Sequence, residues 1–303
     1  MKTIEQYKKL LHNEGIIYFV KNLLRGALHI VKWNNLKKNF QEYDSYLYLK
    51  KYYKKLQYND SDSQLDHHKT IWICWFQGLE QAPELVKKSV ESVRTYCNEY
   101  KVVVLTHKNL HEYVNIPNYI QEKYENGIIS IAHYSDVLRL ILLIQHGGVW
   151  IDATVLLTEK IPKDILESDF FCYRATTAAL SKIKASNWFI VSQPNNIILC
   201  HVRDMLFAYW KMENILVHYY LFHLCFAIVI NKNAECSKIW SKVPNYSNYK
   251  NHLLQSELLN PFNQEIFNDI SKETTVHKLT YKLQFGDSKK QTESFYDFII
   301  KKV

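Results

Sequence analysis

The chain has 303 residues, of which 47% are hydrophobic and 14% aromatic, with only 7 glycines and 6 prolines. This composition excludes a disordered, collagen-like or low-complexity protein and is enough to build a sizeable core. The formal charge is +8, and residues 1–60 alone hold 12 Lys and Arg against 5 Asp and Glu. The six cysteines lie far apart with no CxxC or Cys/His cluster, which argues against a zinc module or a disulfide framework and favours reduced core thiols.

The basic segment is predicted to form an appendage, residues 1–62, to a main domain, residues 63–303. Within it, residues 16–32 place apolar side chains at helical spacing, with lysine, arginine and histidine on the opposite face. A basic, tyrosine-rich stretch follows at 43–58, and the polar run 59–68 is typical of a linker. The appendage therefore carries almost all of the excess positive charge.

Two interpretations of this amphipathic helix stay open: it packs its apolar face on the main domain, or it binds an anionic membrane surface. Nucleic acid is not expected as a partner, because no helix-turn-helix, RNA-recognition or zinc motif accompanies the charge. The N-terminus lacks the apolar core and cleavage site of a secretory signal, and no stretch approaches about 18 uncharged apolar residues. We therefore expect a cytoplasmic protein that does not span the membrane.

From residue 70 onward, strand and helix patterns alternate. Short runs of apolar residues predict strands at 70–76, 101–106, 149–157, 169–175, 187–192 and 274–281. Helical patterns are found at 83–97, 132–146, 194–210 and 214–230. This order predicts an α/β fold with a mostly parallel sheet flanked by helices.

The most informative stretch runs from Tyr134 to Thr154. Asp136 and Arg139 are three residues apart, so they share one face of a helix that is otherwise apolar. Gly147-Gly148 ends that helix and permits positive φ, and Asp152 then stands in an apolar strand-like run. A carboxylate at the carboxyl end of a buried strand lies where open α/β sheets bind ligands and divalent cations. The structural alternative is an Asp136–Arg139 salt bridge with Asp152 capping a turn.

The whole string resembles the SD-x-x-R…GG-x-(Y/W)-x-D-x-(D/T) signature of the DXD-containing sugar transferases. The resemblance covers about residues 70 to 282 and is closest to the bacterial capsular polysaccharide synthesis branch. That branch is also similar at IWICWFQG, at Ser186-Asn187-Trp188-Phe189, at YYLFHLCF and at HKLTYK. The resemblance implies a GT-A fold, a nucleotide-sugar donor such as a UDP-sugar, and a divalent metal, Mn²⁺ or Mg²⁺.

The resemblance also implies a role for several residues near the metal. Asp152 matches the first aspartate of the DXD motif and would hold the cation, whereas Thr154 replaces the second aspartate with a weaker, neutral ligand. His277 would complete the metal shell. Lys282, or else Lys278, would contact the phosphates.

The remaining implied roles concern the donor. Trp75 matches an aromatic residue that stacks on the base, and Asp136 would accept hydrogen bonds from ribose or sugar hydroxyls. Arg139 would contact the transferring sugar or its phosphate, as a catalytic residue together with Asp152. Asn187 would bind hydroxyls of the donor or of the acceptor.

The function expected from the resemblance is transfer of a hexose from a nucleotide-sugar to a lipid-linked oligosaccharide in capsular or surface polysaccharide synthesis, with retention of configuration. Such an enzyme would reside at the inner face of the plasma membrane as a peripheral protein. Two alternatives stay open: an inactive carbohydrate-binding or scaffold protein of the same fold, and a sugar-phosphate transferase.

Overall fold

The computed structural model describes residues 34–54, 56, 69–176, 181–283 and 293–302, with side chains from residue 41 onward. Its centre is a five-stranded sheet in the order β2-β1-β3-β6-β5. The strands are β1 (Thr70–Cys74), β2 (Lys101–Leu105), β3 (Gly148–Ile151), β5 (Phe170–Arg174) and β6 (Ala185–Ser192). β1 pairs in parallel with β2 and β3, and β6 runs antiparallel to β3 and β5. Since only β6 is reversed among these strands, the prediction of a mostly parallel sheet is confirmed.

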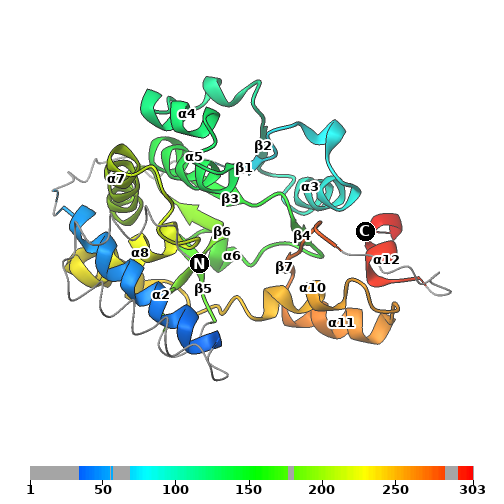
Figure 1. Cartoon of the computed structure of the whole chain (residues 1–303). Helices are drawn as coiled ribbons and strands as arrows, with labels where there is room; N and C mark the ends of the chain where they lie inside the picture. Colours follow the sequence, from blue (N-terminus) through cyan, green and yellow to red (C-terminus); the bar gives the residue numbers. More distant parts are fainter. Residues whose placement is uncertain (1–33, 55, 57–68, 177–180, 284–292, 303) are drawn as a thin grey trace.

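Helices cover the sheet, as Figure 1 shows. α5 packs against β3 and β6, α7 packs on α5, and α8 contacts α7 and β6. These helices and their smaller neighbours are α3 (Glu84–Tyr96), α4 (Asn118–Glu125), α5 (Ile131–His146), α6 (Lys163–Leu166), α7 (Ile197–Met212), α8 (Leu221–Lys232) and α9 (Ala234–Lys242). Short 3₁₀ turns lie at η2 (Leu79–Gln81) and η3 (Leu110–Glu112). The helices at 83–97, 132–146 and 194–210 are therefore confirmed within a few residues.

Helix α5 is apolar almost all round because it is enclosed by the sheet and α7. Its first turn is capped by Ser130, whose side chain accepts a hydrogen bond from the His133 N–H. Its end is set by Gly147, which has φ +63° and leads directly into β3. A Cβ at Gly147 would lie 2.7 Å from the Pro194 Cδ. The predicted positive φ of the glycine pair is confirmed, since Gly148 has φ +93°.

The tyrosine-rich stretch belongs to the core of the described chain. It forms the end of α2 (Asn34–Leu49) and η1 (Lys50–Tyr52), and α2 lies across α8 (Figure 1). Tyr48 and Tyr52 are buried, and each donates a hydrogen bond of 2.6 Å to the Glu213 Oε1. The amphipathic helix predicted at 16–32 and the linker at 59–68 lie outside the described residues.

The predicted helix at 214–230 is wrong in its first half, because α8 begins only at Leu221. The preceding backbone is bound by side chains instead of by helical hydrogen bonds. The Tyr209 hydroxyl donates to the Ile215 carbonyl and accepts from the Val217 N–H at 2.8 Å. Local hydrogen bonds of this kind compete with the helical ladder and hold the segment extended over α7.

The predicted strand at 149–157 is two strands. β3 ends at Ile151, a turn follows in which the Val155 N–H donates to the Asp152 carbonyl at 2.9 Å, and β4 (Val155–Leu157) begins. β4 pairs antiparallel with β7 (Val276–Lys278), the observed core of the predicted late strand. η4 (Lys250–His252), α10 (Leu253–Glu257), α11 (Gln264–Glu273) and α12 (Phe295–Lys302) gather beside this small sheet and α3 (Figure 1).

All six cysteines lie in the described residues and are free thiols, five of them buried, so the prediction of reduced core thiols is confirmed. Within the described residues, the helices are too short or too polar to cross a bilayer.

His277, in the middle of β7, predicts a pH dependence of stability. Burial lowers the pKa of its imidazole to about 4, from 6.5 in the unfolded chain. Between these values the unfolded state binds a proton that the folded state does not, so stability falls as the pH falls. From pH 7 to pH 5, His277 should remove about 2 kcal/mol of unfolding free energy.

The measurement is urea unfolding of wild type and His277→Gln across this pH range. Glutamine can keep a hydrogen bond to Thr158 but does not titrate. The variant should lose less stability than wild type on acidification, although other histidines keep part of the slope. Equal slopes for the two proteins would contradict the buried neutral state of His277.

Candidate functional site

The candidate site lies at one edge of the central sheet, where β1 and β3 end and β6 begins. Trp75 follows β1, Asp152 follows β3, and Asn187 lies near the start of β6. The Asp152 N–H donates to the Trp188 carbonyl at 2.8 Å, which fixes the aspartate against β6. The carboxyl edge of parallel strands is where open α/β sheets place their ligands.

Helix α5 brings two charged side chains to this edge. Asp136 and Arg139 are 9% and 4% exposed, and their side chains form an ion pair at 3.3 Å. Arg139 also lies 3.5 Å from the Asp152 carboxylate and donates to the Asn187 carbonyl. The Asn187 amide in turn donates to the Asp136 Oδ1 at 2.8 Å. The structure thus brings together four of the predicted site residues.

Asp152 is held from several sides. Its Oδ1 accepts a hydrogen bond of 3.0 Å from the Trp150 indole, whose ring also lies under the Arg139 guanidinium at 4.9 Å. Its Oδ2 lies 3.1 Å from the Lys278 Nζ. The same ammonium donates to the Thr154 Oγ1 at 2.6 Å. The D-A-T segment and Lys278 therefore form one hydrogen-bonded unit.

The two carboxylates respond in opposite directions to this environment. Burial raises the pKa of Asp136 above its ordinary value, although Arg139 and His133 oppose the shift. Burial also acts to raise the pKa of Asp152, but Lys278 and Arg139, with hydrogen bonds from Trp150 and Lys278, outweigh it and hold that pKa below its ordinary value. Asp152 is therefore the more firmly ionised of the pair.

Other predicted residues lie differently from expectation. His277 is fully buried and bonds Thr158 at 3.1 Å, so the structure does not pair it with Asp152. Lys282 is exposed, with its Nζ 5.8 Å from the centre of the Tyr281 ring. Trp75 packs edge-on against the same Tyr281 ring at 5.3 Å. Of the two lysines considered for phosphate contact, Lys278 and not Lys282 joins the carboxylate cluster.

The divalent metal that the resemblance implies does not fit these side chains. The two oxygen groups offered by the D-A-T segment, on Asp152 and Thr154, are already bonded to the Lys278 ammonium. The expected third ligand, His277, is turned toward Thr158. Within the described ranges, no group of three His, Cys, Asp or Glu side chains is arranged to hold an ion.

Two residues near the cluster were not predicted as site residues. His223 of α8 is influenced by Arg139 and Asp152, and burial followed by Arg139 lowers its pKa to about 3. Its Nδ1 is buried without a hydrogen-bond partner among the described residues. Tyr219 is 66% exposed, and Asp136 and Asp152 contribute to raising its pKa after burial. Both belong to the YYLFH stretch, which was the one available sequence signal.

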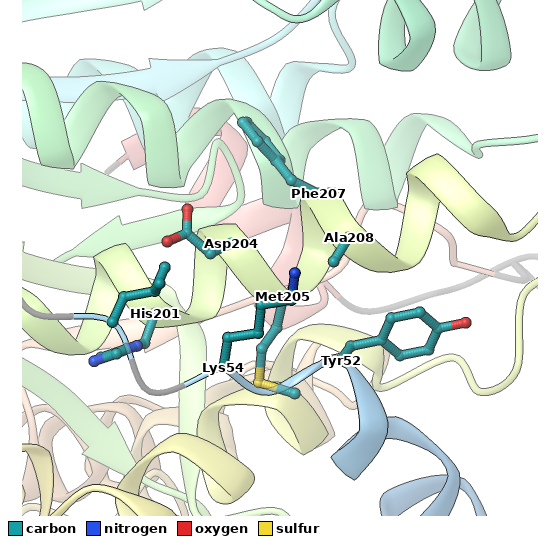
Figure 2. A pocket seen from close by; sticks show the side chains of 8 residues that line it. Tyr52, Lys54, His201, Asp204, Met205, Phe207 and Ala208 are labelled. Carbon is teal, nitrogen blue, oxygen red and sulfur yellow. The ribbon is translucent and has the colours of Figure 1, made fainter.

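A separate pocket of about 240 Å³ lies between α7 and the chain after η1 (Figure 2). None of the predicted site residues contributes to its wall. It is lined by Tyr52, Lys54, Leu56, His201, Asp204, Met205, Phe207 and Ala208.

Comparison with known proteins gives the family. The chain is 27% identical over 163 residues to the O-glycosyltransferase PaGT of Phomopsis amygdali, a match that spans 48% of this chain and 39% of that protein. The solved structure of the PaToxG glycosyltransferase aligns with a TM-score of 0.41 and 13% identity, covering 81% of this chain and 99% of that one. The family described as capsular polysaccharide synthesis protein matches residues 26–299. Because this match covers most of the chain, the protein belongs to the capsular polysaccharide synthesis family, as its motifs predicted.

Proposed function

We propose that the protein is a glycosyltransferase that moves a hexose from a nucleotide-sugar, such as a UDP-sugar, to an oligosaccharide acceptor in surface polysaccharide synthesis. Family membership supports this proposal, as does the similarity to a protein named an O-glycosyltransferase. The observation that carries it is the cluster of Asp136, Arg139, Asp152 and Lys278 at the carboxyl edge of the sheet.

The chemistry of transfer explains why such a cluster is useful. When the bond to the sugar breaks, the nucleoside diphosphate leaves as an anion, and fixed positive charge beside it stabilises the transition state. The cluster supplies two cations, one on α5 and one on β7, held in place by Asp152. Preorganised charge of this kind costs no rearrangement at the moment of reaction.

The donor would extend from Trp75 toward the cluster. The Trp75 indole nitrogen is buried without a hydrogen-bond partner in the described part of the chain, and its ring packs on Tyr281. We assign Trp75 to the base, Asp136 and Asn187 to ribose or sugar hydroxyls, and Lys282 to the outer end of the diphosphate.

Retention of configuration belongs to the same proposal. Asp136 and Asp152 are each paired with a cation, which makes either carboxylate a poor general base. The leaving diphosphate is then the group that takes the proton from the attacking acceptor hydroxyl on the same face of the sugar.

The first prediction concerns the donor. Of a panel of nucleoside-diphosphate sugars, one should be turned over by the purified protein, with release of the nucleoside diphosphate and slow transfer to water when no acceptor is present. Trp75→Ala should lower kcat/KM for that donor by about 10-fold or more through lost stacking on the base. The measurement is nucleoside diphosphate release, followed by identification of the bond formed.

Two outcomes would contradict this assignment. Binding of a nucleotide-sugar without any release would indicate an inactive carbohydrate-binding or scaffold protein. Release of a nucleoside monophosphate with transfer of a sugar phosphate would indicate a sugar-phosphate transferase.

The acceptor side of the proposal rests on Tyr219. Its backbone carbonyl lies 3.0 Å from the His133 Nε2, so the segment before α8 is fixed to the first turn of α5. Its ring is exposed although it lies within electrostatic range of Asp136 and Asp152. An exposed aromatic ring at the border of a polar site offers an apolar face and a hydroxyl to a sugar.

Tyr219→Ala should therefore raise the KM for the acceptor by about 10-fold, as expected when an aromatic contact of 1 to 2 kcal/mol is lost. Donor hydrolysis in the absence of acceptor should stay unchanged. The matched control is Met212→Ala, which removes an apolar side chain that is 69% exposed at the end of α7. A loss of donor hydrolysis in Tyr219→Ala would place this residue on the donor side instead.

We further propose that the acceptor is lipid-linked and that the protein binds the inner face of the plasma membrane through residues 1–62. The support is the charge of this segment, 12 Lys and Arg against 5 Asp and Glu up to residue 60, and the amphipathic pattern at 16–32. Each basic residue near an anionic surface contributes about 1 kcal/mol. An enzyme held at the bilayer meets a lipid-linked acceptor more often.

Reversal of Lys21, Arg25 and Lys32 to Glu should abolish sedimentation with anionic vesicles and leave activity on a soluble acceptor unchanged. The same charge change at three exposed lysines of the main domain should leave vesicle binding intact; these are Lys238, Lys242 and Lys301. Undiminished sedimentation of the first variant would favour packing of this segment on the main domain.

A further inference from the structure

Lys278 is placed beside the D-A-T segment by the register of the small sheet. β4 starts directly after that segment, and Val155 is the partner of Lys278 in the β4–β7 pair. The Leu279 N–H donates to the Thr154 carbonyl at 2.9 Å, which extends the pairing to the segment itself. Side chains alternate along a strand, so when His277 points into the core its neighbour Lys278 points to the site.

The Lys278 ammonium occupies the position between the two side chains that correspond to the DXD motif. It lies 3.1 Å from the Asp152 Oδ2 and 2.6 Å from the Thr154 Oγ1. An ammonium has three N–H donors, and these two contacts use two of them. Because the Lys278 side chain is 19% exposed, its third donor can reach a ligand that enters the site.

The charge of the cluster does not favour a divalent ion. Asp136 and Asp152 are balanced by Arg139 and Lys278, so the four side chains together carry no excess negative charge. A divalent ion at the D-A-T segment would stand next to a guanidinium and an ammonium, and would have to displace the latter. An incoming diphosphate meets the opposite situation, because it brings negative charge to fixed donors.

We propose that the Lys278 ammonium takes the place of the divalent metal as the cation that binds the donor diphosphate, so that the protein acts without a metal. Asp152 and Thr154 are then positioning residues that hold the ammonium, and Thr154 replaces a second aspartate because a hydroxyl suffices to orient a lysine. This inference rests on the proposed function, since it assumes a nucleotide-sugar donor.

The test is calorimetric titration with UDP, GDP, CDP, ADP and dTDP, each in excess EDTA and again in millimolar Mn²⁺. Wild type should bind one of them with the same Kd in both buffers. Lys278→Met should weaken that binding about 10-fold or more in EDTA, as expected for a lost hydrogen bond between charged groups. Lys278→Arg should retain most of it.

The matched control is Lys272→Met. Lys272 forms an ion pair of the same length, 3.1 Å, with Asp269, but on the surface, where its side chain is 75% exposed. Its removal should leave the Kd unchanged. If Lys278→Met does not fold, Thr154→Val provides the second variant, because it removes one anchor of the ammonium and should weaken binding in EDTA to a smaller extent.

Each contrary result has a distinct meaning. Tightening of wild-type binding more than 10-fold by Mn²⁺ would overturn the role of Lys278 and leave the proposed function standing. The same is true if folded Lys278→Met, or Thr154→Val in its place, binds as wild type does in EDTA. Absence of binding by wild type to all five nucleotides in both buffers would overturn the proposed function as well.

Discussion

The arrangement of the site depends on one buried guanidinium. Arg139 connects three parts of the fold, because it contacts Asp136 on its own helix, Asp152 after β3, and the backbone of Asn187 on β6. Removing one partner of a buried ion pair leaves the other charged and unpaired, at a cost of about 3 to 5 kcal/mol. Here two carboxylates would be left. Arg139 is therefore as much a condition of the fold at this edge as a group available to a ligand.

The spacing of the motif follows from the geometry of one helix and one strand. Arg139 precedes the Gly147 turn by eight residues, about 12 Å of helix, and Asp152 follows Gly148 by four residues, about 13 Å of strand. Since the glycine pair reverses the chain, the two side chains return to the same level. The apolar remainder of α5 packs this helix against β3 and β6 and makes the approach close enough for an ion pair.

These relations explain how much could be predicted from the sequence. The sheet, the helices around it and the meeting of Asp136, Arg139 and Asp152 were accessible, because they depend on periodicity and on spacing within a continuous stretch. The early part of 214–230 was not, because its hydrogen bonds go to Tyr209, a residue of the preceding helix. Likewise, the run 149–157 carries apolar residues through a turn that only the hydrogen bond from Val155 to Asp152 reveals.

The choice between His277 and Lys278 shows where such prediction stops. Both residues lie on β7, and both are chemically plausible beside a carboxylate that faces phosphates. Which one faces Asp152 depends on the pairing of Val155 with Lys278, a contact between segments more than a hundred residues apart. A shift of one residue would turn an imidazole toward Asp152 and bury an ammonium in the core. Burying an unpaired ammonium is far more costly than burying a neutral imidazole, so the energetics of the core select the register that presents lysine to the site.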